Sequence, residues 1–348
     1  MRIRERFLSW VLRRQAGGAT ASGVLRELPR KLYHKGSDAI LQWMNRLAVR
    51  RHDEMYGARL DRVLAQSDAN PCVLVLVPRI LHYVIPCLTL ARRRVAVVVV
   101  CNGARPWEVE ALAQRFPDIP MLDLRPVRGS MMPHGVVLDL LLRHATRSFA
   151  LLDPDLFVFD PDVFDELNLR RGEVACGAFG FTNPRSGLVF PTTHLLALDV
   201  PVIQELMATY HIRPIIYDRT PQHLVEPLGS LGLGDHNFPK HYLSFYDPLN
   251  LILAMAAYDG LQQRILHRDE SAVYHVGGVS YLEQNVTLDY FNARLLDQPF
   301  ARSFRERYRK PLFGTRDPAT ARERVVRGGA EKLLEGIDRT IERVAEVM

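Results

Sequence analysis

An alternation between short apolar runs and segments with a helical pattern constrains the fold of this chain more than any other feature. The first run, Cys72-Val-Leu-Val-Leu-Val77, contains no polar side chain and is followed directly by Pro78. Apolar, β-branched runs of this length are typical of parallel strands that are buried on both faces. Similar runs follow at 95–101, 119–124 and 148–152, and the intervening segments that predict helices are 80–93, 106–116 and 133–147. We therefore expect an α/β fold: an open, doubly wound, mainly parallel sheet with helices on both faces, which binds ligands at the carboxyl ends of its strands.

After residue 172 the alternation becomes less regular. The expected strands there are 173–181, 187–190, 194–199 and 271–276, and the expected helices lie near 201–210, 221–232 and 247–260. Before the first run, a helical stretch extends to about Gln66. The expected organisation is a basic helical arm over 1–68, a central domain over 69–300 that divides near residue 172, and a helical arm over 301–348.

The distribution of charge separates the arms from the central domain. The net charge of +6 hides an excess of seven basic residues in 1–35, where nine Lys and Arg accompany two Asp and Glu. The last 48 residues, 301–348, hold twelve basic and eight acidic side chains. The part between them holds 24 basic and 29 acidic residues and is therefore net acidic. This balance argues against a central domain that binds nucleic acid.

Each arm carries an apolar stripe that needs a partner. In residues 1–15, Ile3, Phe7, Trp10 and Val11 share one helical face among arginines, which suits an interfacial helix on anionic lipid. A helix that docks on the body or on a second subunit fits equally well. In the C-terminal arm the stripe comprises Ala330, Leu333, Leu334, Ile337, Ile341 and Val344. Because that arm has few aromatic residues to anchor it in lipid, we expect packing or formation of a homo-oligomer.

The four cysteines, Cys72, Cys87, Cys101 and Cys176, are scattered without a CxxC pair and predict neither a disulfide framework nor a zinc site. Most of them lie in or beside predicted strands, where cysteine behaves as a small apolar residue. No window has the apolar length needed to cross a bilayer, and the N-terminus lacks the pattern of a signal peptide. We expect a cytoplasmic protein, held at the inner face of the membrane if the N-terminal helix binds lipid.

The sequence Asp-Pro-Asp occurs twice, and the two copies have different contexts. Asp153 and Asp155 follow the fourth apolar run and would lie at the exposed end of a buried strand. Carboxylate oxygens there suit Mn²⁺ or Mg²⁺ bound together with a phosphate, although the pair can also simply cap a turn. The second copy, at 160–162, has the pattern of a helix start, with Asp160 as N-cap and Pro161 in the first turn.

The stretch from His134 to Asp155, a helix that leads into a strand ending in Asp-Pro-Asp, resembles the core of GT-A fold nucleotide-sugar glycosyltransferases of the family-2-like, Asp-x-Asp-containing type. Earlier elements match in order, with Val77-Pro78 after the first strand and Asn102-Gly103 after the second. The similarity covers about residues 70–200. It implies a metal-dependent hexosyltransferase-type enzyme that takes a sugar from a nucleoside-diphosphate sugar. The implied acceptor is a saccharide or a lipid-linked molecule, in cell-surface polysaccharide synthesis.

The resemblance also implies roles for individual residues. Residues 69–172 would form the nucleotide-sugar half and 173–300 the acceptor half. Asp153 and Asp155 would ligate the metal, with Asp155 favoured, and Asp153 would also contact the donor. Pro78, Asn102 and His134 would lie on the donor side. Many relatives have an acidic residue where Asn102 stands, but its amide can still bind a base.

Two further residues are candidates for the same site. His275 ends a predicted strand before Gly277-Gly278, and the resemblance implies that such a late histidine returns to the metal. A core histidine beside a turn is the alternative. Arg128, in a loop before the helix that begins near His134, would meet the diphosphate or would remain a solvated arginine.

If the enzyme inverts the anomeric centre, an Asp or Glu must accept the proton of the acceptor hydroxyl. The candidates are Asp199, Asp235 and Asp247, of which we prefer Asp247, although helix capping explains that residue equally well. Two other functions stay open. A sugar-nucleotide nucleotidyltransferase would need a glycine-rich loop after the first strand, which Val77-Pro-Arg-Ile-Leu does not provide. A catalytically inactive GT-A-like scaffold would not need the intact Asp-Pro-Asp motif.

Overall fold

The computed structural model describes residues 53–66, 70–124, 131–217, 219–239, 246–277, 279, 285–308 and 317–348, together with residues 43, 47 and 50. The expected lipid-binding helix at 1–15 and the candidate residue Arg128 lie outside the described residues.

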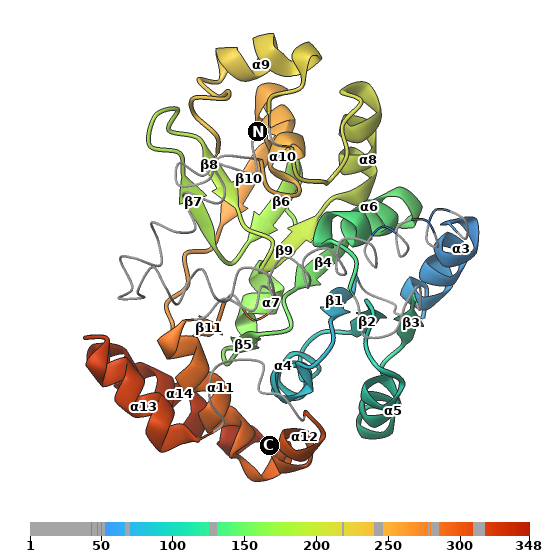
Figure 1. Ribbon diagram of the computed structural model, residues 1–348. Coiled ribbons are helices and arrows are strands. Elements are labelled where there is room, and N and C mark those ends of the chain that lie inside the picture. Colours follow the sequence, from blue (N-terminus) through green and yellow to red (C-terminus); the bar gives the residue numbers. More distant parts are fainter. Residues whose placement is uncertain are drawn as a thin grey trace.

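A seven-stranded sheet forms the centre of the molecule, with the strand order β10-β6-β9-β4-β1-β2-β3 (Figure 1). The strands are β1 (Cys72–Leu76), β2 (Val97–Cys101), β3 (Met121–Asp123), β4 (Phe149–Leu152), β6 (Glu173–Gly177), β9 (Leu195–Leu198) and β10 (Gln262–Ile265). Neighbouring strands are parallel except at β9, which is antiparallel to both β4 and β6. The predicted α/β fold with a mainly parallel sheet is confirmed.

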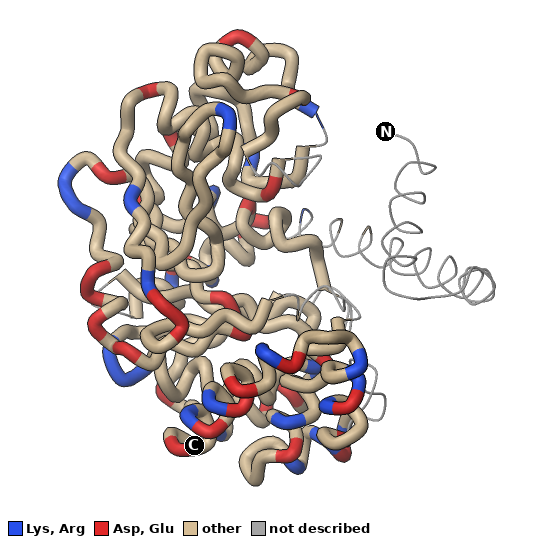
Figure 2. Tube along the Cα trace, turned by 90° about the vertical axis from the view of Figure 1, so that its left-hand side faces the viewer, with Lys and Arg blue, Asp and Glu red and all other residues tan. Residues whose placement is uncertain are grey.

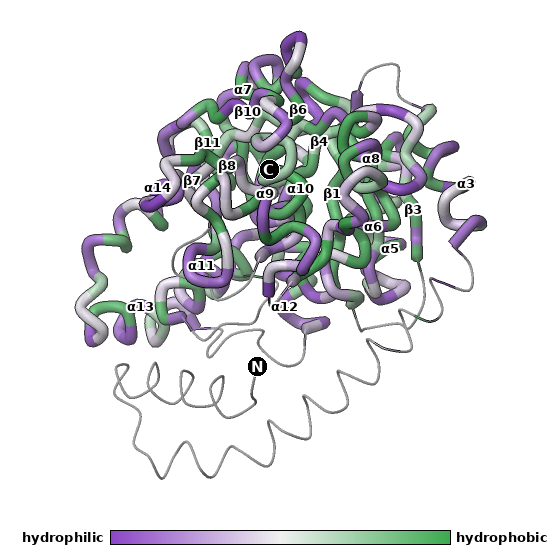
Figure 3. Tube along the Cα trace, turned by 90° about the horizontal axis from the view of Figure 1, so that it is seen from above, coloured by the Kyte–Doolittle hydropathy of each residue, from purple (hydrophilic) through white to green (hydrophobic). Residues whose placement is uncertain are grey.

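Helices cover both faces of the sheet because the side chains of each strand alternate between two apolar cores. Along β1, Leu74 and Leu76 contribute to one core, and Val73 and Val75 to the other. The first core includes residues of α4 (Leu81–Ala91), α5 (Pro106–Arg115), α7 (Asp162–Glu166) and α11 (Val286–Leu296). The second includes residues of α3 (Asp53–Leu64), α6 (His134–His144), α8 (Val200–Thr209), α9 (Val225–Ser230) and α10 (Asn250–Tyr258). Seen from above, the hydrophobic strands occupy the middle of the molecule (Figure 3).

The structure differs from the prediction mainly after residue 155. The strand expected over 173–181 is two strands, because the chain turns after β6 and pairs β7 (Gly180–Thr182) with β8 (Val189–Pro191). The strand expected over 271–276 is β11 (Val273–His275), which lies outside the main sheet and pairs with the unpredicted β5 (Leu156–Val158). Strand β10 was also missed, because it is a half-exposed edge strand with the polar sequence Gln-Gln-Arg-Ile.

Two smaller predictions can be compared directly with the structure. Helix α7 begins at Asp162 with Pro161 in the N-cap position, one residue later than expected. Asp160 nevertheless supports the helix start, because its Oδ1 accepts a hydrogen bond from the Asp162 backbone N–H at 3.1 Å. All four cysteines are free and buried, which confirms that they act as small apolar residues.

The C-terminal helices pack on the body of the molecule. They are α12 (Arg302–Arg307), α13 (Pro318–Arg327) and α14 (Leu334–Val347), and they gather beside α11 and α4 (Figure 1). Ile337, Ile341 and Val344 of α14 belong to the same core as α4, so the body is a partner of the predicted stripe, while Leu333 stays exposed. Figure 2 shows residues of both charges along the surface of this region. No helix in the described part of the chain is both long and apolar enough to span a membrane.

Candidate active site

The Asp-Pro-Asp motif at 153–155 lies at the point where the sheet reverses its direction of winding. Strand β1 is flanked by β2 on one side and by β4 on the other, and Asp153 directly follows β4. In open α/β sheets, ligands bind at the carboxyl ends of the strands at such a point. The Asp153 backbone N–H donates to the carbonyl oxygen of His194 at 2.8 Å, which fixes the start of the motif against the neighbouring chain segment.

A short antiparallel ladder brings His275 back to this motif. Strand β11 pairs with β5 so that His275 stands opposite Leu156, immediately after Asp155. The backbone N–H of Val276 donates to the Asp155 carbonyl oxygen at 3.1 Å. As a result, Nε2 of His275 lies 3.6 Å from Oδ2 of Asp153 and 3.5 Å from Oδ1 of Asp155. The structure therefore brings together the three residues that the resemblance implied as metal ligands.

His194 is a member of the same group that sequence reasoning missed. It precedes β9, whose first residue, Leu195, pairs with Leu152 at the end of β4. The imidazole rings of His194 and His275 lie with their centroids 3.9 Å apart and their planes tilted by 33°. Nδ1 of His194 is 3.2 Å from the Thr192 hydroxyl oxygen. Only the antiparallel register of β9 places this histidine beside Asp153, and nothing in the local sequence indicates that register.

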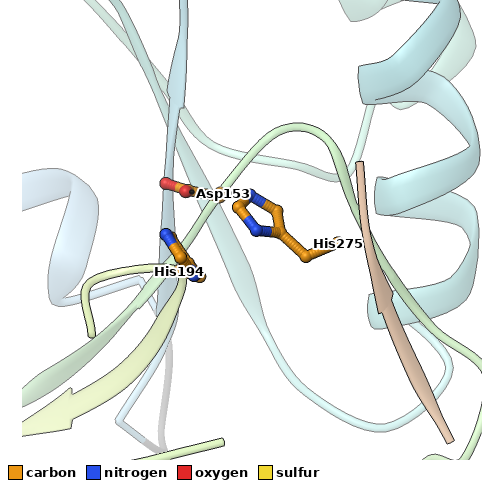
Figure 4. A group of neighbouring side chains, drawn as sticks. All are labelled: Asp153, His194 and His275. Carbon is orange, nitrogen blue, oxygen red and sulfur yellow. Dashed lines mark ion pairs between the residues drawn. The ribbon is translucent and has the colours of Figure 1, made fainter. Parts of the chain in front are cut away.

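Asp153, His194 and His275 form a set of side chains that fits a divalent metal ion. One ligand atom from each lies within 4.8 Å of the other two, and the three side chains point toward one another (Figure 4). Ligands bound at about 2.1 Å to one ion lie about 3–3.4 Å apart, so the three ligand atoms would have to move closer together to bind one ion. Asp155, which is only 5% exposed, lies outside this group although it contacts His275. The geometry thus favours Asp153 over Asp155 as a direct ligand.

The charges of this group compensate one another. Burial alone would lower the pKa of His275, but hydrogen bonds and Coulombic attraction to Asp153 and Asp155 outweigh it and raise that pKa to about 10. Burial raises the pKa of Asp153, and the His275 imidazolium acts in the opposite direction. Two carboxylates in one partly buried place need a cation, and a protonated His275 or a metal ion meets that need.

A cavity of about 50 Å³ lies between this group and the start of α6. It is lined by Val73, Val75, Val77, His134, Leu151, Leu152, Asp153, Pro154, Asp155 and Val279. Nε2 of His134 is buried and has no hydrogen-bond partner among the described residues. Burial lowers the pKa of His134, against the opposing effects of Asp153 and Asp247. His134 therefore offers a neutral imidazole, with an unpaired nitrogen, in the wall of a cavity that also contains both motif carboxylates.

The other donor-side candidates are placed differently. Pro78 is partly buried, directly after the cavity residue Val77. Asn102 is only 1% exposed, and its side chain bonds to a backbone rather than facing solvent. Its Oδ1 accepts from the Met132 N–H at 2.8 Å, and its Nδ2 donates to the Met132 carbonyl oxygen at 3.0 Å. In this structure Asn102 therefore ties the segment before α6 to the end of β2, a role that differs from the base contact expected from the sequence.

The three candidate bases lie in different surroundings. Asp199 caps α8, with its Oδ1 accepting from the Val202 N–H at 3.3 Å. Asp235 accepts from the Thr220 N–H at 2.7 Å, and this bond lowers the pKa of Asp235. Asp247 is partly buried before α10, and its charge acts on His134. Of the three, Asp247 is thus the one that the structure links electrostatically to the cavity wall.

Comparison with known proteins supports a sugar-transfer function for the first part of the chain. Residues 51–203 match the family model described as the StrH glycosyltransferase N-terminal domain. The matched region contains β1 to β4, the motif at 153–155 and His194, but not His275. This match covers less than half of the chain and shows that these residues are similar to a glycosyltransferase domain.

A solved structure entitled "WbbM bifunctional glycosytransferase apo structure" is also similar to this chain. The match has a TM-score of 0.35 and 12% sequence identity, and covers 69% of this chain and 51% of that one. The chain therefore spans about half the length of that solved protein. No curated protein matches the sequence.

Proposed function

We propose that the chain is a metal-dependent glycosyltransferase that moves a sugar from a nucleoside-diphosphate sugar to a hydroxyl group of a saccharide or lipid-linked acceptor. One observation carries the proposal. Asp153 directly follows β4 within the glycosyltransferase-like region and meets His194 and His275 at the switch point of the sheet. This combination supports a metal and a donor diphosphate at one place.

In this function, each residue of the site would have a separate role. Asp153, His194 and His275 would hold a Mn²⁺ or Mg²⁺ ion, and the buried Asp155 would orient the His275 ring. When bound, such an ion supplies positive charge that neutralises the departing diphosphate. In the transfer, the bond between the anomeric carbon and the phosphate oxygen breaks, and a bond to the acceptor oxygen forms. If the configuration inverts, the proton of the acceptor hydroxyl passes to the carboxylate of Asp247.

The experiment that tests this function is thermal denaturation with a panel of nucleoside diphosphates, each with and without Mn²⁺. Binding to the native state alone raises the melting temperature, so we expect stabilisation by one diphosphate in the presence of Mn²⁺. Asp153→Ala should abolish this response. The second motif offers a control, because Asp162 belongs to the same Asp-Pro-Asp sequence, at its third position, but is exposed at the start of α7.

Asp162→Ala should therefore keep the response of the unchanged protein. If no nucleoside diphosphate stabilises the protein under either condition, both the transferase and the nucleotidyltransferase functions are contradicted. Incubation of the responding nucleotide's sugar derivative with acceptor then separates the two enzymes. A transferase releases the nucleoside diphosphate, whereas a nucleotidyltransferase releases pyrophosphate only from a nucleoside triphosphate.

A further inference from the structure

Arg79, two residues beyond the cavity residue Val77, has a backbone conformation that is unusual for its residue type. Its φ angle is +71°, in the left-handed region. Residues with a Cβ atom rarely adopt this region, because the side chain crowds the backbone. Such strain persists where the surroundings hold it, and it is concentrated at functional sites. Arg79 follows β1 beside the switch point, so the strained residue lies at the edge of the sheet where a ligand would bind.

A buried glutamate holds this backbone. Oε1 of Glu108 accepts a hydrogen bond from the Arg79 N–H at 2.6 Å, while Oε2 accepts one from the Arg105 N–H at 2.8 Å. The hydroxyl group of Tyr308 donates to Oε1 of Glu108 at 2.8 Å and accepts from the Leu81 N–H at 3.3 Å. Glu108 is fully buried and Tyr308 is 3% exposed. A residue from the far end of the chain, just after α12, thus secures the loop after β1.

Among the described residues, the guanidinium group of Arg79 pairs with no carboxylate, whereas two arginines of the next segment do: Arg92 pairs with Asp118 at 3.2 Å, and Arg94 pairs with Asp165. Arg79 is partly buried, so it is not simply a solvated surface residue. Asp153 and Asp155 place two carboxylates at the switch point, so a diphosphate bound there adds negative charge to negative charge. A diphosphate that approaches Asp153 and Asp155 would need cations beyond a single metal ion.

We propose that Arg79 binds the diphosphate of the donor, and that Glu108 and Tyr308 position it. This inference rests on the proposed function, because it assumes that a diphosphate binds at the switch point. A guanidinium group presents a rigid fork of N–H donors that matches two phosphate oxygens, which explains why an arginine stands here. The strained backbone of Arg79 fixes the point from which its side chain extends. Arg79 is a binding residue, whereas Glu108 and Tyr308 act through it.

The test uses inorganic pyrophosphate with Mn²⁺ as the probe, because it carries the diphosphate without a base or a sugar. Isothermal titration measures pyrophosphate affinity at saturating Mn²⁺, and Mn²⁺ affinity alone in a separate titration. We expect Arg79→Gly to weaken pyrophosphate binding by about 10- to 100-fold and to leave Mn²⁺ affinity unchanged. Glycine accepts the left-handed conformation without strain, so this variant removes the side chain and keeps the loop.

Arg79→Lys should lie between the unchanged protein and Arg79→Gly, because it keeps the charge and loses the fork. Arg92→Ala, which removes an arginine already paired with Asp118, is the matched control and should bind pyrophosphate normally. If Arg79→Gly binds pyrophosphate as tightly as the unchanged protein, while Asp153→Ala does not bind it, this inference is overturned and the proposed function stands. If the unchanged protein binds neither pyrophosphate nor any nucleoside diphosphate with Mn²⁺, the proposed function itself fails.

The positioning role has a test of its own. Tyr308→Phe keeps the ring beside Trp107, whose centroid lies 5.4 Å away, and removes only the hydroxyl group that secures Glu108. It should weaken pyrophosphate binding by about three- to tenfold. The same substitution in an Arg79→Gly background should have no further effect, because the two residues would act as one unit. Equal losses in both backgrounds would show that Tyr308 acts on the general fold and not through Arg79.

Discussion

The two Asp-Pro-Asp motifs have the same sequence but lie in different surroundings. The motif at 153–155 leaves the central strand β4 and is enclosed by His194, His275 and the cavity. The motif at 160–162 is partly to fully exposed and begins the short helix α7. Its carboxylate at position 160 accepts a backbone hydrogen bond, as in many helix starts. The comparison shows that two copies of one short sequence have different surroundings, because the fold places different residues opposite them.

The largest expected difference between the two motifs concerns their contribution to Mn²⁺ affinity. Asp153→Ala should weaken Mn²⁺ binding by about 100-fold or more, because it removes a direct ligand and leaves two histidines, whereas loss of an orienting neighbour costs about 10- to 100-fold. Asp162→Ala should leave Mn²⁺ affinity unchanged. Electron paramagnetic resonance of free Mn²⁺ measures both. Equal losses in the two variants would mean that the motifs are equivalent and that the enclosed one is not a metal site.

The next effect concerns the kind of metal. Two imidazoles and one carboxylate suit first-row transition metals better than Mg²⁺, which prefers oxygen ligands. His194→Ala should therefore weaken Mn²⁺ and Co²⁺ binding by about tenfold. The ratio of the affinities for these two ions to the affinity for Mg²⁺ should fall as a result. His236→Ala, at an exposed histidine, serves as the control. Unchanged Co²⁺ absorption spectra in the His194 variant would show that this ring only stacks on His275.

A second aspartate–histidine pair, between α3 and the end of α6, allows a structural pair to be compared with the proposed metal site. Asp53 of α3 lies 2.7 Å from Nη1 of Arg143 and 3.0 Å from Nε2 of His144, both at the end of α6. The Arg143 hydrogen bond is the largest influence, and together these contacts lower the pKa of Asp53 to about 2, against the opposing effect of burial.

Because the folded-state pKa is depressed, this pair stabilises the protein above the ordinary aspartate pKa, and the benefit disappears as pH falls through about 2. Asp53→Asn should lower the free energy of unfolding by about 2 kcal/mol at pH 7. The difference from the unchanged protein should shrink between pH 4 and pH 2, as urea denaturation at each pH would show. Adding Mn²⁺ should not alter the difference. A difference that stays constant over this range would contradict the assigned charge pairing.

The smallest effect belongs to the second motif. Asp160→Ala removes the acceptor for the Asp162 N–H and should cost about 0.5–1 kcal/mol, as loss of a helix-start hydrogen bond does. Nucleotide and metal binding should be unchanged. Chemical denaturation measures the stability, and the Mn²⁺ titration provides the comparison. A loss of metal binding in this variant would remove the distinction between the two motifs.

The sequence predicted more of the first half of the site than of the second. Pro78 and Asp153 directly follow apolar runs, so their positions at strand ends could be predicted from the local sequence. His194 could not be found in this way, because its place depends on the antiparallel register of β9 with β4. Strand β10 was missed for a related reason: an edge strand needs no apolar pattern on its exposed side. Nothing in the local sequence indicates the positive φ of Arg79, whose backbone N–H bonds to Glu108 of α5.

By itself the sequence determined the α/β class, the succession of the first four strands along the chain and the acidic motif after the fourth, because burial on both faces of a parallel sheet leaves a continuous apolar pattern. The tertiary structure alone decided which carboxylates meet histidines and which glutamate binds the backbone of Arg79. Those contacts join residues far apart in the chain, such as Asp153 with His275 and Glu108 with Tyr308. Strand order and register create such contacts, and a periodic pattern along one segment records its burial but not its neighbours.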